Sequence, residues 1–261
     1  MADITASMVK ALRDETAQSM MECKKALQEA DGDQDKAKDI LRQKGLATAA
    51  KKAERETSEG LVSIKKADGS AAMVMVRCET DFTARNEVFQ EMVEQVAELA
   101  FQADDGEVTE TPEIKEAVQG AFEKIGENMS YGKGYKLSAP TVGSYLHHNS
   151  KVGVIVGVEG DVDEDTLTGL CMHIAFTDPI AINIDDVPED LVEKEREFAT
   201  QEAIASGKPE DIAKKMVDGK MRKFLAANAL MEQPYVRDEK QAVKEVLGGA
   251  QVLNFARFSV A

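Results

Sequence analysis

The chain has 261 residues, 43% of them hydrophobic and 31% charged, which is typical of a folded globular protein and excludes a chain disordered throughout. Its 48 acidic residues outnumber 32 basic residues, and the net charge of −16 argues against direct binding to nucleic acid or to anionic membrane surfaces. The three cysteines are odd in number and widely spaced, which argues against a disulfide framework or a cysteine-rich metal site.

The first 52 residues show a helical pattern in three apolar-periodic segments. Ser19 followed by Glu22 has the spacing of a capping box, which marks the start of the second segment, whose apolar residues include Met20 and Met21. We therefore expect a three-helix domain at residues 1–52. No basic segment followed by an apolar core opens the chain, and no run is long enough to span a bilayer, so a cytoplasmic protein is expected.

A strand pattern begins after Gly60, beyond a short charged linker. Residues 61–64 and 71–78 are predicted to pair as a hairpin around a turn at 67–70. The second strand is almost continuously apolar, as expected of a strand that is covered on both faces.

Two further helices are predicted at about residues 86–101 and 113–125, separated by an acidic surface loop at 102–112. Gly132-Lys133-Gly134 lacks the spacing of a phosphate-binding loop and is interpreted as a flexible turn. Residues 53–140 are thus predicted to form a first core subdomain.

The same order of elements then recurs. Strands are predicted at 142–146 and 151–158, with a turn between them, and a helix follows that ends at Met172-His173-Ile174-Ala175-Phe176. We interpret this as a second, related hairpin-plus-helix subdomain at residues 141–186, completed by residues 231–261, which end in an alternating strand.

Residues 187–230 are predicted to form an antiparallel helical hairpin, broken at Gly207-Lys208-Pro209. Its dense charge and its narrow stripe through Leu191, Lys194 and Phe198 indicate a projection that offers a surface for a partner or for self-association. The predicted fold class is therefore α+β, with a helical N-terminal domain, two related β-hairpin-plus-helix subdomains and a protruding hairpin.

The three histidines are candidates for metal ligands or for a general base. His147 and His148 are expected to point to opposite faces of a strand, which separates them as ligands, and His173 has no nucleophile motif beside it. The sequence therefore favours a protein that binds neither metal nor cofactor and is not an enzyme. An enzyme built on an unrecognised histidine site remains an alternative.

Two segments stand out, LRDETAQSMMECKKAL at residues 12–27 and CETDFTAR at residues 78–85. They resemble the two signatures of the elongation factor Ts family, and the resemblance continues in order through Ile125-Gly126-Glu127-Asn128 and most of the remaining chain. It implies a first domain of the ubiquitin-associated type. Thr83 stands where the family usually has valine. The chain ends at Ala261, where members with an additional C-terminal helix continue.

The resemblance implies a guanine nucleotide exchange factor that binds elongation factor Tu in its GDP-bound and nucleotide-free states during translation elongation. In the family, the phenylalanine of the Thr-Asp-Phe loop enters a pocket beside the magnesium site of elongation factor Tu and dislodges the ion. The resemblance assigns this role to a segment of four residues in this chain, and four other residues are candidate contacts with the partner. The segment is Thr80, Asp81, Phe82 and Thr83, and the further candidates are Arg13, His147, Met172 and His173.

Two readings of Phe82 follow from its neighbours. Thr80, Asp81 and Thr83 suit a helix N-terminus, where their side chains satisfy free amides and leave Phe82 pointing outward. Alternatively, Phe82 and Phe89 share one helix face and are both core residues. The resemblance favours the outward position. A helical adaptor that binds a protein partner without exchange activity is the alternative function.

Overall fold

The computed structural model describes residues 4–16, 18–67 and 69–260. Three helices come first and form their own apolar cluster around Leu12 and Leu27; they are α1 (Ala6–Thr16), α2 (Met20–Glu29) and α3 (Gln34–Lys52). The predicted capping box is present, because the Glu22 amide donates to Ser19 Oγ at 3.2 Å and the Ser19 amide donates to Glu22 Oε2 at 3.3 Å. Residues 1–3 and 17 of the predicted first domain lie outside the described residues, as do residue 68 of the predicted turn and residue 261.

An antiparallel sheet follows, with strand order β1-β2-β4-β3. Its strands are β1 (Glu59–Ala67), β2 (Ser70–Cys78), β3 (Gly106–Val108) and β4 (Met129–Ser138). The predicted hairpin is confirmed as β1 and β2. The prediction of a loop throughout residues 102–112 is wrong, because β3 lies within it and pairs with β4.

The prediction of a flexible turn at Gly132-Lys133-Gly134 is also wrong, because these residues lie within β4. Met75 pairs with Lys133 and Val76 with Tyr131, so Gly132 is the extra residue of a β-bulge. A Cβ atom on Gly132 would lie 2.9 Å from Met75 Cε and 3.0 Å from the Met75 carbonyl oxygen. The glycine therefore allows close approach of two strands and does not mark a turn.

A second antiparallel sheet has the order β5-β6-β9. Its strands are β5 (Thr141–Leu146), β6 (Val152–Glu159) and β9 (Gln251–Ser259). In both sheets a hairpin's second strand pairs with a later strand, and that pairing contains a bulge, at Met75/Val76 in one sheet and at Gly157/Val158 in the other. The recurring order of elements is the pattern from which we infer a repeated unit.

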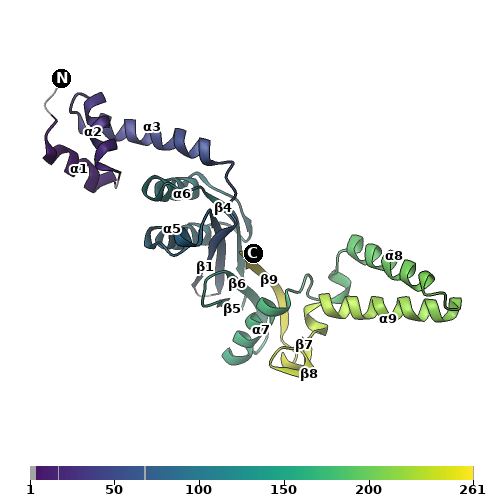
Figure 1. The fold of residues 1–261 in the computed structure, drawn as a ribbon. Helices are drawn as coiled ribbons and strands as arrows, with labels where there is room; N and C mark the ends of the chain where they lie inside the picture. Colours follow the sequence, from purple (N-terminus) through teal and green to yellow (C-terminus); the bar gives the residue numbers. More distant parts are fainter. Residues whose placement is uncertain (1–3, 17, 68, 261) are drawn as a thin grey trace.

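The two sheets pack face to face between two layers of helices (Figure 1). Alternate side chains of β2 point to opposite faces of the first sheet. Val74 and Val76 pack against the outer helices, whereas Met73 and Met75 pack against the second sheet. The prediction that this strand is covered on both faces is confirmed. The covering helices are α5 (Glu87–Phe101) and α6 (Pro112–Ile125) on the first sheet, and α7 (Glu164–Thr177) and α10 (Val243–Val246) on the second.

Helices α8 (Glu189–Ala205) and α9 (Glu210–Asn228) form an antiparallel hairpin, and Figure 1 shows it extending from the sheets on the side away from α1–α3. Leu191, Lys194 and Phe198 of the predicted stripe are exposed, as expected of a surface outside the core, whereas Ala199 and Ala203 are buried. That this surface binds a partner stays a prediction. The other short elements near its base are η1 (Ile184–Asp186), η2 (Leu230–Glu232), β7 (Pro234–Tyr235) and β8 (Asp238–Ala242).

The ends of the predicted hairpin segment are buried in the body of the protein. Val187 packs with Ala181 and Ala229, and Leu230 lies in the cluster under the second sheet. The projecting part is therefore α8–α9, which is shorter than residues 187–230. Within the described ranges, no helix combines the length and the apolar character needed to cross a bilayer.

Candidate functional site

The Thr-Asp-Phe segment forms the turn between β2 and α5, and includes the one-turn helix α4 (Asp81–Ala84). Thr80 caps this helix, since its hydroxyl accepts a hydrogen bond from the Thr83 amide at 3.3 Å. The Cys78 thiol donates to the Thr80 carbonyl at 3.3 Å, and burial raises the pKa of this thiol to about 12, so it stays neutral. The turn is thus held by side chains at its entry.

Phe82 points away from this supported turn, and 79% of its surface is exposed. Phe89 is fully buried under the first sheet. The two residues lie on separate helices, α4 and α5, so the alternative in which they share one face is wrong. The predicted outward position of Phe82 is confirmed, and an exposed phenylalanine on a fixed turn is a candidate contact for a partner.

Thr83 differs from the other members of the segment, because only 4% of its surface is exposed. Its side chain packs inside the turn, in keeping with the valine usual at this position of the family. The expected direct contact is therefore corrected for Thr83, whereas Thr80 and Asp81 are half-buried and Phe82 is exposed.

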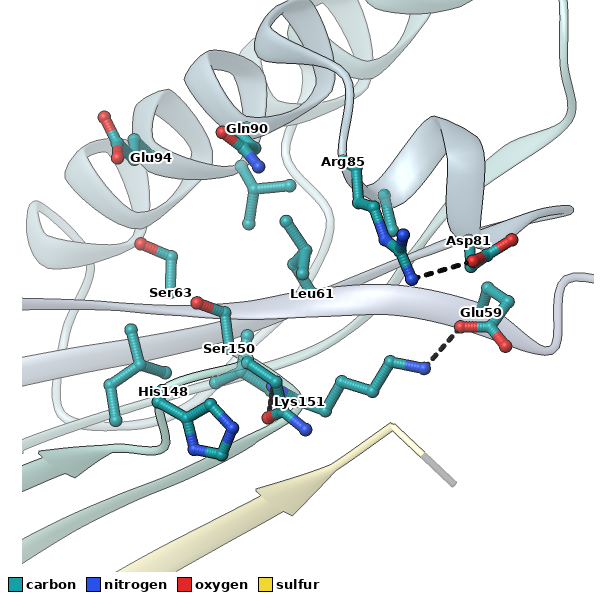
Figure 2. A pocket seen from close by; sticks show the side chains of 15 residues that line it. Glu59, Leu61, Ser63, Asp81, Arg85, Gln90, Glu94, His148, Ser150 and Lys151 are labelled. Atoms are coloured by element: carbon teal, nitrogen blue, oxygen red, sulfur yellow. Dashed lines mark hydrogen bonds and ion pairs between the residues drawn. The ribbon is translucent and has the colours of Figure 1, made fainter.

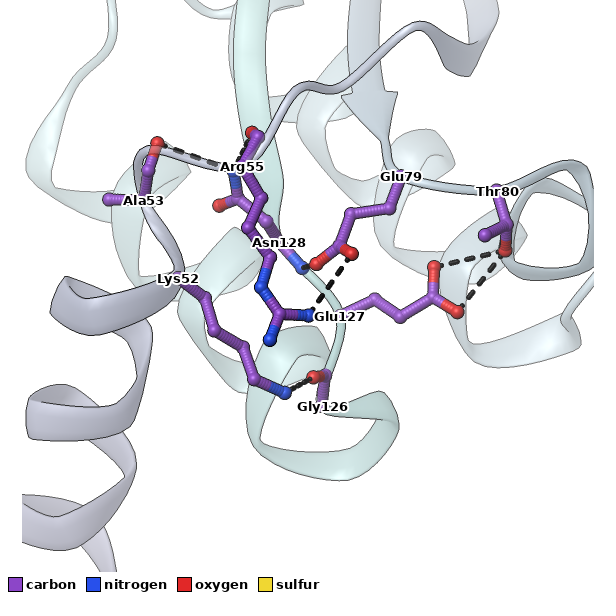
Figure 3. A network of polar contacts seen from close by, with 8 residues as sticks. All are labelled: Lys52, Ala53, Arg55, Glu79, Thr80, Gly126, Glu127 and Asn128. Atoms are coloured by element: carbon purple, nitrogen blue, oxygen red, sulfur yellow. Dashed lines mark hydrogen bonds and ion pairs between the residues drawn. The ribbon is translucent and has the colours of Figure 1, made fainter.

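A network of polar contacts surrounds the start of the turn (Figure 3). The Thr80 hydroxyl lies 3.1 Å from Oε1 and 3.0 Å from Oε2 of Glu127. Glu79 Oε1 accepts from the Asn128 amide at 2.6 Å, and Glu79 Oε2 lies 3.3 Å from Arg55 Nη1. The Asn128 hydrogen bond, with a smaller contribution from Arg55, lowers the pKa of Glu79, which keeps this carboxylate charged.

A groove runs beside the turn, between the two sheet-and-helix units (Figure 2). Asp81 and Arg85 lie on one side of it and are paired at 3.0 Å. His148 and Lys151 lie on the other side, and Lys151 Nζ pairs with Glu59 at 2.6 Å. The structure thus brings the Thr-Asp-Phe turn and the turn after β5 to the rim of one groove.

The remaining predicted contacts are distributed over the molecule. Arg13 is exposed on α1, Met172 is exposed on α7, and these helices lie on different sides of the protein in Figure 1. His147 is half-buried, and its Nδ1 lies 2.8 Å from the Tyr145 hydroxyl. It follows β5 and is outside the strand, and its ring centroid lies 4.3 Å from that of His148, so the prediction of opposite strand faces is wrong.

His173 is fully buried, so the expected direct partner contact is corrected there too. Its Nε2 lies 2.8 Å from Gln233 Oε1, and its Nδ1 accepts from the Val236 amide at 3.1 Å. Burial lowers the pKa of this imidazole, against the opposing effect of Gln233. His173 thus fastens α7 to the segment before β8.

Sequence reasoning missed the exposure of two methionines and the contacts of two residues beside the turn. Met20 and Met21 were placed in the apolar set of the second helix, yet both are exposed; their position immediately after the Ser19 cap was the available signal. Glu127 and Asn128 were recognised only as part of the resemblance, because a hydrogen bond between distant residues leaves no local pattern. Among the residues that the structure describes, no three His, Cys, Asp or Glu side chains gather as a metal site.

Known proteins are similar to this chain over almost its whole length. A family model described as elongation factor TS matches residues 79–261. A relative from Idiomarina loihiensis, named elongation factor Ts, is 42% identical over 266 residues, covering 98% of this chain and 91% of the relative. A protein of the same name from Pasteurella multocida is 44% identical over 270 residues, covering 100% of this chain and 93% of the relative.

Proposed function

The chain belongs to the elongation factor Ts family, and we propose that it accelerates GDP release from elongation factor Tu by dislodging magnesium with its Phe82 turn. It acts as a guanine nucleotide exchange factor in translation elongation. The observation that carries the proposed mechanism is the exposed Phe82 side chain on a turn whose backbone is fixed by Thr80. A backbone held in this way is ordered before it meets a partner, which lowers the entropic cost of binding.

Magnesium neutralises the oxygens of a bound diphosphate, so its loss leaves that charge poorly compensated and weakens nucleotide binding. In the proposed mechanism, Phe82 acts on the magnesium site of elongation factor Tu and not on the nucleotide itself. The effect requires no covalent step, so we propose that the protein is not an enzyme in the chemical sense. Cytoplasmic localisation and the lack of direct nucleic-acid binding belong to the same proposal, in keeping with the net charge of −16.

Phe82 cannot supply the whole effect. Burying one phenylalanine stabilises a complex by about 1.5–3 kcal/mol, whereas nanomolar nucleotide binding is worth roughly 12 kcal/mol. We propose that the remaining binding free energy comes from a broad interface. It includes exposed side chains of the N-terminal helices, the residues near His147 at the rim of the groove, and Met172. The N-terminal side chains are Arg13, Met20 and Met21. Such an interface binds the nucleotide-free state more tightly than the GDP-bound state, and by linkage an incoming nucleotide weakens the complex equally.

The proposed division of the chain follows these roles. Residues 1–52 bind elongation factor Tu, residues 53–140 carry the Phe82 turn, and residues 141–186 with 231–261 form the second subdomain. The hairpin offers exposed Phe198 and Ile204 for self-association or for a partner.

The test is release of fluorescently labelled GDP from elongation factor Tu by stopped flow, with and without the protein. The proposed function predicts that release accelerates with the protein's concentration and reaches a plateau. Binding to elongation factor Tu without any acceleration would instead support the adaptor alternative. Turnover of a small molecule that depended on His173 would support an enzyme, although this residue is buried against Gln233.

A further inference from the structure

The segment Gly126-Glu127-Asn128 joins α6 to β4 and contacts two functional parts of the molecule at once (Figure 3). Gly126 ends α6 with φ of +79°, a left-handed conformation that glycine adopts without strain. The next two residues, Glu127 and Asn128, lie between the Phe82 turn and the connector at residues 53–58, which joins α3 to β1. No predicted role from the sequence covers them.

On one side, Glu127 sets the direction of the Thr80 hydroxyl. A threonine hydroxyl has one proton and two lone pairs, so donating to the Glu127 carboxylate leaves a lone pair for the Thr83 amide. A hydrogen bond to a carboxylate is stronger than one between neutral groups, and it polarises the hydroxyl oxygen as an acceptor. Glu127 is itself half-buried, so water competes with this contact less than it does at an exposed site.

On the other side, Asn128 holds the segment in place. Its side-chain amide donates to the Arg55 carbonyl at 2.8 Å and to the Ala53 carbonyl at 3.4 Å. Its own backbone amide donates to Glu79 at 2.6 Å, and Lys52 donates to the Gly126 carbonyl. The carboxylate of Glu127 is therefore presented from a segment that is anchored to the connector and to the end of β2.

We propose that Glu127 is a positioning residue for nucleotide exchange, which orients the Thr80 cap and through it the Phe82 side chain. This inference rests on the proposed function, because it names a residue on which that activity depends. Glu127 bonds Thr80, and Thr80 in turn begins the helix that carries Phe82. Loss of the carboxylate loosens the turn, so a smaller fraction of the bound complexes holds Phe82 in its productive orientation, which lowers the maximal rate.

The experiment compares Glu127→Ala and Glu127→Gln with Glu110→Ala, which removes the same charge from an exposed glutamate before α6. For each variant, labelled GDP release is measured against factor concentration, which separates the maximal rate from the half-saturating concentration. Glu127→Ala is expected to lower the maximal rate about tenfold, or about 1.4 kcal/mol, with the half-saturating concentration changed less than about twofold. Glu127→Gln keeps a neutral acceptor and should lose about threefold, and Glu110→Ala should match the unmodified protein.

A double mutant separates positioning from a general structural role. If Glu127 acts through the turn, Phe82→Ala combined with Glu127→Ala should be no slower than Phe82→Ala alone. Multiplied losses would overturn the inference, as would wild-type rates in both Glu127 variants. If circular dichroism shows that Glu127→Ala is unfolded, the same comparison is made with Glu127→Gln, alone and combined with Phe82→Ala.

The two proposals fail in different ways. If the unmodified protein does not accelerate GDP release, the proposed function fails and the positioning role falls with it. If the unmodified protein accelerates release and Phe82→Ala abolishes that effect, but Glu127→Ala retains it, only the positioning role of Glu127 is wrong.

Discussion

Replacing Phe82 by alanine is expected to leave the stability of the protein almost unchanged, whereas replacing Phe89 is expected to lower it strongly. The two phenylalanines are seven positions apart and form a matched pair. Phe89 is fully buried in the core under the first sheet, and Phe82 is 79% exposed. The same chemical change therefore removes core packing at one position and mainly solvent-exposed surface at the other.

The expected magnitudes follow from burial. Truncating a buried phenylalanine costs about 3–5 kcal/mol, which corresponds to a fall in melting temperature of about 6–20 °C for a chain of this size. Because Phe82 is 79% exposed, only about a fifth of the 1.5–3 kcal/mol available from burying a phenylalanine is at stake. Phe82→Ala should thus cost about 0.3–0.6 kcal/mol and shift the melting temperature by about 1–2 °C.

Thermal unfolding followed by circular dichroism measures both variants against the unmodified protein. A loss at Phe82→Ala as large as the loss of about 3–5 kcal/mol expected at Phe89→Ala would refute the assignment of Phe82 as an exposed side chain outside the core. A small loss at both positions would instead contradict the packing of α5 on the first sheet.

Three further outcomes are expected. Deleting residues 1–52 should weaken binding to elongation factor Tu in a pull-down or titration while the remainder still unfolds cooperatively, because the N-terminal helices form their own apolar cluster; loss of cooperative unfolding would contradict the boundary. Replacing Glu189 to Asn228 with a short linker should preserve the strand signal in circular dichroism, since Val187 and Leu230 stay in place to fill the core, and an unfolded remainder would show that the hairpin is not a projection. Burial lowers the pKa of His173 in the folded protein below 6.5, so the unfolded chain takes up a proton on this imidazole at a higher pH than the folded chain does. The free energy of unfolding, measured by urea denaturation, should therefore be full above about pH 6.5 and fall below it, and His173→Gln should remove this fall; an unchanged fall in His173→Gln would show that another group titrates.

Local signals allowed much of the fold to be predicted. Ser19 and Glu22 marked a helix start through side-chain chemistry that acts within three residues, and the apolar run of β2 indicated a strand covered on both faces. The strand β4 was missed because Gly132 and Gly134 are typical of turns in sequence, whereas here Gly132 forms a bulge against Met75 and Gly134 pairs within the strand. Pairing with a strand more than fifty residues earlier leaves no mark in the local pattern.

Local signals predicted part of the candidate site as well. The polar residues around Phe82 predicted an outward side chain because they cap the turn locally, and the structure has that cap at Thr80. Burial of Thr83 and His173 could not be predicted in this way, because it depends on tertiary packing. The contact between Thr80 and Glu127 spans 47 positions, so the sequence could indicate both residues without indicating that they meet.

The central claim, that Phe82 couples binding of the factor to loss of magnesium and GDP, is tested most directly by the release of labelled GDP from elongation factor Tu. The measurement compares the unmodified protein with Phe82→Ala at saturating concentrations over a series of magnesium concentrations, with binding to elongation factor Tu determined in parallel. We expect Phe82→Ala still to bind elongation factor Tu, with an affinity lowered far less than its maximal release rate. Added magnesium should slow release chiefly with the unmodified protein. Unchanged release by Phe82→Ala at every magnesium concentration would contradict the central claim.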